Sequence, residues 1–308
     1  MRRLFAALLL TAAVVTVGAA PVSGGSYPGE NGLIAFSRLT SDGDPVLGIF
    51  TVDPTTLEVA GPLGGAQFDS EPVWSPDGTR IAFASLRAGG DNQIFVMNAD
   101  GTDVQGLTPA DDGNTCPTWS PDGTRIAYSN GDADIVIIPS DGGAPLATFP
   151  VDSCHLAWSP LGDRIAFVDA GGLSFVDVAT GVVTPFTSDP TDFAPSWSPD
   201  GTRLVFGRGD QFVARLFVAP VDDASAAQPI TDGPGDTFPA WSPDGSLITF
   251  STDGGQGRIA VVAATGGPVT FLTGDPDALD TEPDWQPIPI APPPSPPTPV
   301  VIDPTFTG

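Results

Sequence analysis

The sequence predicts an all-β protein, a six-bladed β-propeller, and three observations lead to this fold class. A segment built around Trp-Ser-Pro recurs with Trp-to-Trp spacings of 45, 39, 39, 44 and 44 residues. A period of about 42 residues with strand-like content is typical of four-stranded propeller blades. The 37 Gly and 35 Pro break long helices and favour short strands, while 41% hydrophobic residues argue against a disordered chain. The repeats are centred on Trp74, Trp119, Trp158, Trp197, Trp241 and, in part, Trp285.

Each repeat predicts four strands in order. In the copy from Glu71 to Phe83, the residues before Trp74 form an inner strand, and Ser-Pro-Asp-Gly makes a hairpin turn. Pro presets φ, Asp caps locally and Gly tolerates a positive φ. Ile-Ala-Phe is the second strand, and an apolar run such as 93–97 is the third. After a second turn, the fourth strand ends near a Leu-Thr or Phe-Thr pair.

The two ends of the repeat region are incomplete in complementary ways. The first second-strand copy, Leu33-Ile-Ala-Phe36, has no Trp strand before it, and the last Trp strand, around Trp285, has no second strand after it. We therefore expect Glu282–Gln286 to pair with Leu33–Ser37. This pairing closes the ring and removes the exposed sheet edges that invite aggregation.

Five Trp-Ser-Pro copies, most followed by Asp-Gly and Arg-Ile or Arg-Leu, resemble the WD40-like PD40 repeats of TolB-type six-bladed propellers. The resemblance covers about residues 30–287. One blade departs from it with Leu161-Gly162-Asp163 and another with Ser246-Leu247. TolB itself has an N-terminal α/β domain used in the Tol–Pal envelope system, and the sequence before the first strand is too short to supply one. The resemblance therefore implies the fold without the Tol–Pal role.

The segments outside the repeats have their own signatures. Residues 1–20, with Arg2 and Arg3 before an apolar run and small residues after it, predict a cleaved signal peptide. The protein is then secreted or held in the periplasm or cell envelope. Residues 30–287 form the propeller. Residues 288–308 are rich in Pro and predict an extended tail.

The charge balance narrows the partners. The net charge is −26, and all 11 basic residues are Arg. Nucleic acid is repelled by such a chain, so we expect no nucleic-acid partner. Loops that join blades carry many Asp, which predicts one acidic face. The favoured function is an exported, monomeric, non-enzymatic scaffold that binds a basic protein or peptide through this face.

A narrower set of residues stands five positions before each Trp. Sixfold repetition predicts that these residues surround one mouth of the central channel. At about 8 Å and a dielectric constant near 20, adjacent carboxylates repel by about 2 kcal/mol, which a bound Ca²⁺ would offset. Alternatively, each Asp accepts backbone hydrogen bonds within its own turn and faces water. The set, called here the mouth ring, is Asp69, Asn114, Ser153, Asp192, Asp236 and Asp280, with Ca²⁺ ligands predicted at Asp69, Asp192, Asp236 and Asp280.

Other residues near the Trp positions suggest further chemistry. Residues three positions before Trp are mixed in type and predict local packing. Their list is Glu71, Cys116, His155, Ala194, Phe238 and Glu282.

A catalytic constellation of Ser153, His155 and an Asp is conceivable, because alternate strand residues share a face. It keeps open a propeller hydrolase or lyase at the channel mouth as an alternative function. A Ca²⁺-binding structural envelope protein is another. Export also favours a Cys116–Cys154 disulfide between consecutive blades, with two thiols as the alternative. Apart from Ca²⁺, no cofactor is expected.

Overall fold

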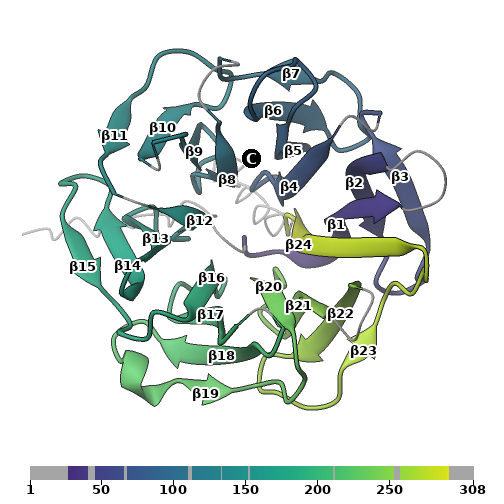
Figure 1. Cartoon of the computed structure of the whole chain (residues 1–308), viewed down its shortest axis with the longest axis vertical. Helices are drawn as coiled ribbons and strands as arrows, with labels where there is room; N and C mark the ends of the chain where they lie inside the picture. Colours follow the sequence, from purple (N-terminus) through teal and green to yellow (C-terminus); the bar gives the residue numbers. More distant parts are fainter. Residues whose placement is uncertain are drawn as a thin grey trace, which may run out of the picture.

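A computed structural model describes residues 27–40, 46–65, 68–109, 113–132, 134–151, 153–210, 212–252 and 257–290. These residues form six four-stranded antiparallel sheets arranged as a closed ring around a central axis (Figure 1). The predicted fold class, an all-β six-bladed propeller, is confirmed. The predicted signal peptide and residues 291–308 of the Pro-rich tail lie outside the described residues.

The strands follow the predicted order in every blade, with the inner strand next to the channel. Blade 1 contains β24 (Ala278–Ile288), β1 (Glu30–Thr40), β2 (Val46–Val52) and β3 (Val59–Leu63). Blade 2 contains β4 (Asp69–Trp74), β5 (Arg80–Ser85), β6 (Gln93–Asn98) and β7 (Gln105–Gly106). Blade 3 contains β8 (Thr115–Trp119), β9 (Arg125–Ser129), β10 (Ile135–Pro139) and β11 (Ala147–Phe149). Blade 4 contains β12 (Cys154–Trp158), β13 (Arg164–Asp169), β14 (Gly172–Asp177) and β15 (Val183–Pro185). Blade 5 contains β16 (Asp192–Trp197), β17 (Arg203–Arg208), β18 (Arg215–Pro220) and β19 (Gln228–Pro229), with a 3₁₀ turn at Ala224–Ala226. Blade 6 contains β20 (Asp236–Trp241), β21 (Leu247–Thr252), β22 (Arg258–Ala263) and β23 (Thr270–Phe271).

The ring is closed by the two ends of the propeller. β24 pairs antiparallel with β1, with Ile34 opposite Trp285, so the predicted closure is confirmed. Gln286 extends the closure to the next blade. Its side chain accepts from the Leu33 backbone N–H at 3.2 Å and donates to the Gly78 carbonyl oxygen at 2.8 Å. The last strand is therefore bonded to blades 1 and 2.

The Ser-Pro-Asp-Gly turns form as their sequence predicts. In blade 2, Asp77 Oδ1 accepts from the Ser75 hydroxyl at 2.6 Å and from the Thr79 backbone N–H at 3.1 Å. Gly78 has a φ of 67°, which glycine adopts without steric cost. The same hydroxyl–carboxylate contact recurs at Ser120, Ser198 and Ser242. These turns mark one face of the disc, called here the bottom face.

The core consists of blade-to-blade contacts made by the repeated aromatic residues. The six Trp are at most 3% exposed. The Arg that follows each Asp-Gly-Thr turn covers the Trp of the next blade: the guanidinium carbon of Arg80 lies 4.7 Å from the ring centre of Trp119, and Arg203 lies 4.6 Å from that of Trp241. Cation–π contact and the aliphatic stem of Arg thus seal the joint between blades.

The residues before β1 cross the bottom face. The Tyr27 hydroxyl donates to the Trp119 carbonyl oxygen in blade 3 at 3.2 Å, and the Gly29 N–H donates to the Pro243 carbonyl oxygen in blade 6 at 3.2 Å. Blades 3 and 6 lie opposite each other, so this short segment passes across the channel axis (Figure 1). The face opposite the Ser-Pro-Asp-Gly turns is called here the top face.

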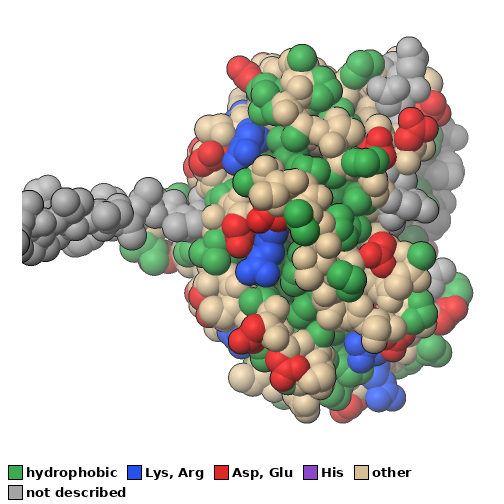
Figure 2. Space-filling model, turned by 90° about the vertical axis from the view of Figure 1, so that its left-hand side faces the viewer, with side chains coloured by type: hydrophobic (Ala, Val, Ile, Leu, Met, Phe, Trp, Pro, Cys, Tyr) green, Lys and Arg blue, Asp and Glu red, His purple; other side chains and the backbone are tan. Residues whose placement is uncertain are grey.

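On the side of the disc that Figure 2 shows, acidic, basic and apolar side chains are interspersed. No helix within the described residues has the length and apolar character that crossing a membrane would require.

Candidate functional site

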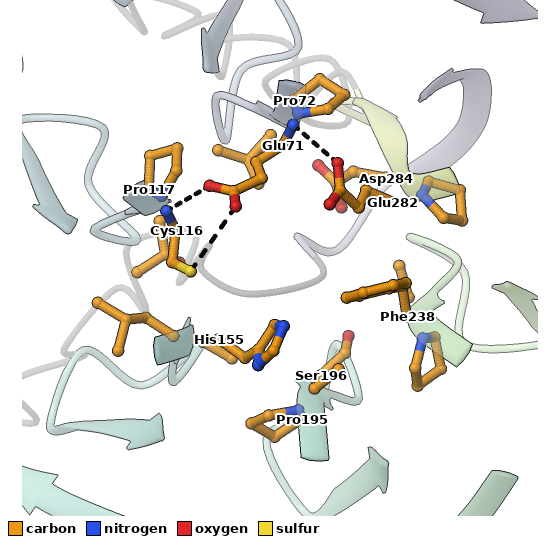
Figure 3. A pocket seen from close by; sticks show the side chains of 18 residues that line it. Glu71, Pro72, Cys116, Pro117, His155, Pro195, Ser196, Phe238, Glu282 and Asp284 are labelled. Atoms are coloured by element: carbon orange, nitrogen blue, oxygen red, sulfur yellow. Dashed lines mark hydrogen bonds between the residues drawn. The ribbon is translucent and has the colours of Figure 1, made fainter. Parts of the chain in front are cut away.

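The channel is lined by the residue three positions before each Trp. All six of these residues have a positive φ, between 47° and 56°, and each inner strand carries a register shift at this point. Such a bulge re-aims a side chain and breaks the alternation of faces along a strand. The sequence predicted local packing here, whereas these side chains line a cavity of about 140 Å³ (Figure 3). They are Glu71, Cys116, His155, Ala194, Phe238 and Glu282.

The mouth ring lies elsewhere. Its six side chains, Asp69, Asn114, Ser153, Asp192, Asp236 and Asp280, are at most 5% exposed and lie inside their own blades. Of the six, none lines the 140 Å³ cavity, and Asp280 is the one that lines the second cavity described below, of about 460 Å³. The bulge explains the difference, because it turns the residue at −3 toward the channel while the residue at −5 stays in the sheet. The structure thus does not bring the mouth ring together around one ligand.

Three mouth-ring carboxylates are neutralised by an Arg of the same blade. Arg38 Nε lies 2.6 Å from Asp280 Oδ1 and Nη2 lies 2.7 Å from Oδ2. Arg87 binds Asp69 and Arg208 binds Asp192, both at 2.5 Å. These ion pairs offset the mutual repulsion that the sequence attributed to the ring.

Each of these Arg side chains also lies over a pair of phenyl rings. The guanidinium carbon of Arg38 is 5.3 Å and 5.2 Å from the ring centres of Phe36 and Phe50, which face each other across β1 and β2. The same arrangement occurs with Phe83 and Phe95 around Arg87, and with Phe206 and Phe217 around Arg208. We call this unit the Arg clamp. It occurs in blades 1, 2 and 5.

In blade 6, Asp236 occupies the position of the clamp carboxylate, but the residue opposite it is Thr instead of Arg. Its register partner on β21 is Thr252, where Asp192 and Asp280 have Arg208 and Arg38. Burial raises the pKa of the Asp236 carboxyl, against the lowering effect of the Thr231 and Thr252 hydroxyls. Asp236 Oδ2 is buried without a hydrogen-bond partner.

Calcium binding at Asp69, Asp192, Asp236 and Asp280 stays a prediction. The described residues contain no group of three or more His, Cys, Asp or Glu positioned to hold a metal ion. Three of the four carboxylates bind Arg instead, so the geometry does not favour the calcium hypothesis.

A cluster of three carboxyl groups occupies one wall of the channel (Figure 3). Glu282 Oε2 accepts from the Ser37 hydroxyl at 2.8 Å and from the Glu71 backbone N–H at 3.1 Å. Glu71 Oε2 in turn accepts from the Cys116 backbone N–H at 2.5 Å, so each carboxylate bonds to the next blade. We call Glu71, Glu282 and Asp284 the acidic wall.

Asp284 is the member of the acidic wall that departs most from ordinary carboxyl behaviour. Its Oδ2 accepts from the Trp74 backbone N–H at 2.7 Å. Burial nevertheless raises the pKa of Asp284 to about 7, because desolvation of the charged form outweighs that hydrogen bond. The corresponding positions of the other blades carry Val73, Thr118, Ala157, Ser196 and Ala240. This carboxyl is therefore an addition peculiar to the closing strand.

His155 of blade 4 and Phe238 of blade 6 also line the channel, and their ring centres lie 5.5 Å apart (Figure 3). The alternation that would place Ser153 and His155 on one face is broken by the bulge at His155, where φ is 54°. Ser153 is buried in its blade, and its carbonyl oxygen accepts from the Ser129 hydroxyl. The proposed catalytic pair thus loses the strand geometry on which it depended.

The predicted disulfide stays a prediction. Cys116 lines the channel, and its Sγ lies 4.0 Å from Glu71 Oε1. The side chain of Cys154 lies outside the described residues.

A second cavity opens beside the channel on the top face. It measures about 460 Å³ and lies between the inner strands and loops of blades 5, 6 and 1. Its large side chains are Phe193, Phe212, Phe238 and Leu279, and it shares His155 and Phe238 with the channel. We call it the groove. The repeat pattern does not predict it, because the groove combines strand residues such as Phe193 and Leu279 with Phe212, which lies in a loop between β17 and β18.

Comparisons with known proteins agree with this architecture. The model of the PD40 family, described as the TolB beta propeller domain, matches residues 28–144 and 141–288. The chain is similar to the solved structure of TolB from Acinetobacter baumannii, with a TM-score of 0.71 and 17% identity, over 85% of this chain and 68% of that one. It is also similar to a putative TolB from Agrobacterium tumefaciens, with a TM-score of 0.62 and 20% identity, over 83% of this chain and 99% of that one.

A curated relative is similar over part of the chain. The Bacillus subtilis protein named "Uncharacterized peptidase YuxL" is 31% identical over 152 residues. The aligned stretch covers 46% of this chain and 22% of that protein. The chain thus spans well under two thirds of this relative.

Proposed function

The chain belongs to the TolB β-propeller domain family, and on this premise we propose that it is an exported, non-enzymatic scaffold that binds a protein partner through its top face. Export rests on the signal peptide predicted from residues 1–20. The Tol–Pal role is not part of the proposal.

One observation carries this function: a groove with exposed apolar side chains opens beside the channel on the top face. Phe212 is 65% exposed, Val213 beside it 62%, and Leu279 47%. Exposed acidic residues lie nearby in sequence at Asp210 and Asp277. Apolar patches rimmed by polar residues mark interaction sites, because burying them against a partner removes the apolar surface from water.

The charge of the chain favours a basic partner. The net charge of the chain is −26. Three of its Arg residues are already paired with buried mouth-ring carboxylates, namely Arg38, Arg87 and Arg208. Long-range attraction would speed encounter with a cationic surface and weaken as salt rises. A monomer with one such face is sufficient for this role.

The experiment is an affinity capture from envelope extract with the purified chain as bait, followed by a binding assay with the identified partner. Phe212→Ser and Leu279→Ser should each weaken binding at least about tenfold, since interface anchors carry most of the affinity. Leu146→Ser is the matched control, because Leu146 is 58% exposed and lies between β10 and β11, away from the groove. Equal binding by all three variants would remove the groove from the proposal, and a partner indifferent to salt would remove the charge argument.

A hydrolase remains the second candidate, and the observation that favours it is the relative named a peptidase. His155, in the channel, is the titratable group best placed for such chemistry. A screen of purified protein on peptide, ester and glycan substrates tests this candidate. Turnover that His155→Ala abolishes would replace the scaffold proposal with an enzyme. Calcium titration by calorimetry tests the structural alternative in the same preparation.

A further inference from the structure

Blade 6 carries a mouth-ring carboxylate that the propeller leaves without an Arg partner. Asp69, Asp192 and Asp280 each bind the Arg of an Arg clamp, whereas Asp236 takes part in none of the ion pairs among the described residues. Lys does not occur in the sequence, and every Arg of the propeller lies within the described residues. The fourth carboxylate of the ring therefore has the place of a clamp acid but not its cation.

The rest of the clamp in blade 6 is reduced in a matching way. In the three Arg clamps, the two phenyl rings face each other across neighbouring strands. Blade 6 keeps the first ring as Phe250, but the residue opposite is Ala260. Thr252 stands where blades 1 and 5 have the clamp Arg. Arg258, opposite Thr252 on β22, has its guanidinium carbon 3.9 Å from the ring centre of Phe271. The acid and one ring of the clamp thus remain, and the guanidinium is missing.

The Asp236 carboxyl is buried and incompletely bonded. The residue is 3% exposed, and Oδ2 has no hydrogen-bond partner. The hydroxyls of Thr231 and Thr252 lower the pKa of this carboxyl, but burial outweighs them and raises it. A buried acceptor without a donor costs free energy, which a donor placed at Oδ2 would recover. A cationic donor recovers the most, because it also supplies the missing charge.

The groove gives a ligand access to this position. Thr252 lines the groove, together with Gly235, the residue before Asp236. The place that Arg fills in blades 1 and 5 therefore borders a cavity of about 460 Å³ in blade 6. Phe193 and Phe212 line the same cavity and offer apolar walls. A molecule with a cationic head and an apolar body matches both features.

We propose that blade 6 binds a small organic cation, a guanidine or amine with an apolar body, whose charged head takes the vacant clamp position at Asp236 and Thr252 while the body lies in the groove. The head donates to Asp236 Oδ2 and completes the clamp as Arg does in blades 1, 2 and 5. This site goes beyond the proposed function, because a small ligand needs no protein partner. An inorganic cation would leave the apolar walls of the groove unfilled.

The test uses two probes of the same shape, phenethylguanidinium and the neutral phenethylurea. Calorimetry on the full chain at neutral pH should show binding of the guanidinium probe and at least about tenfold weaker binding of the urea, because only the former brings a charge to Asp236. Asp236→Asn should remove this preference, so that both probes bind with the same weak affinity. Asn has nearly the size of Asp, so this variant keeps the shape of the site and decides the test by itself.

Two further variants locate the effect. Asp132→Asn is the matched control, because it also removes one carboxylate, an exposed one in the loop between β9 and β10, and it should leave the preference unchanged. Thr252→Arg should abolish the preference, because its own side chain restores the clamp and fills the site. No binding of phenethylguanidinium at about 1 mM, or a preference that survives Asp236→Asn, would overturn the inference, as would a preference that Asp132→Asn abolishes equally.

Discussion

Removing the cation of one Arg clamp should cost the propeller much of its stability. Arg38 and Asp280 form a two-bond ion pair at 2.6 Å and 2.7 Å, with side chains 9% and 2% exposed. Arg38→Met keeps most of the stem that packs on Phe36 and Phe50 but leaves Asp280 buried and unpaired. Breaking a buried pair in this way typically costs about 3–5 kcal/mol. Asp275, 3.9 Å away and half exposed, adds at most about 1 kcal/mol.

The pair can be isolated with a double-mutant cycle. Asp280→Asn alone should also destabilise strongly, because it leaves the guanidinium buried without its partner. The double variant Arg38→Met, Asp280→Asn removes both charges. Its loss of stability should therefore be smaller than the sum of the two single losses by at least about 2 kcal/mol. The exposed pair of Arg164 and Asp163 supplies the control: Asp163→Asn should cost less than about 1 kcal/mol.

The assay is urea unfolding at neutral pH followed by tryptophan fluorescence, since the six buried Trp report on the blade joints. A loss below about 1 kcal/mol for Arg38→Met would refute the reasoning, as would single effects that simply add in the double variant. Either result would mean that Asp280 finds water or another donor when Arg38 is removed.

Three further outcomes are expected. Asp236→Asn should stabilise the protein at neutral pH by about 1–2 kcal/mol in urea unfolding, because it replaces a buried carboxyl that has no cation; a loss of stability would contradict this. Asp284 has its pKa raised from 3.8 to about 7, so the folded state favours its neutral form and stability is lost as pH rises from about 4 to about 7. In the Asp284→Asn variant, the free energy of unfolding should fall less between about pH 4 and pH 7 than in the parent protein, by at most about 4 kcal/mol. If the free energy of unfolding varies with pH in the same way in both proteins, the prediction is wrong. Gly78→Ala should lower the thermal stability more than Gly245→Ala, although both glycines have similar positive φ. A β-carbon at Gly78 would lie 2.2 Å from the Pro287 carbonyl oxygen, whereas a β-carbon at Gly245 would meet nothing closer than 3.7 Å. Equal losses of stability in the two variants would argue against tight ring closure.

The architecture could be predicted because its signals are local. Each Ser-Pro-Asp-Gly turn is bonded within itself, as Asp77 shows with Ser75 and Thr79, so four residues suffice to identify it. Repetition of that turn at blade spacing fixed the strand order. Closure followed from counting, because an unpaired second strand at Leu33 and an unpaired Trp strand at Trp285 can only complete each other.

The site was harder to predict because it depends on bulges. A residue at a fixed distance from Trp faces the channel only if the strand alternates regularly, and the bulge at positions such as Glu71 and His155 breaks that rule. The mouth ring, including Asp69 and Asp192, is therefore buried, and residues that looked like packing line the channel instead. Asp284 carried a usable signal, since it alone among the six equivalent positions is acidic.

The sequence by itself determined the number of blades, the turns, the closure of the ring and the strongly negative charge, because these depend on neighbouring residues and on counting. Only the tertiary structure decided which carboxylates are neutralised and which remain to meet a ligand. Arg38 and Asp280 are 242 positions apart, and Trp74 reaches Asp284 across 210. Contacts over such distances form when the ring closes, and the electrostatics of the channel are set at that point.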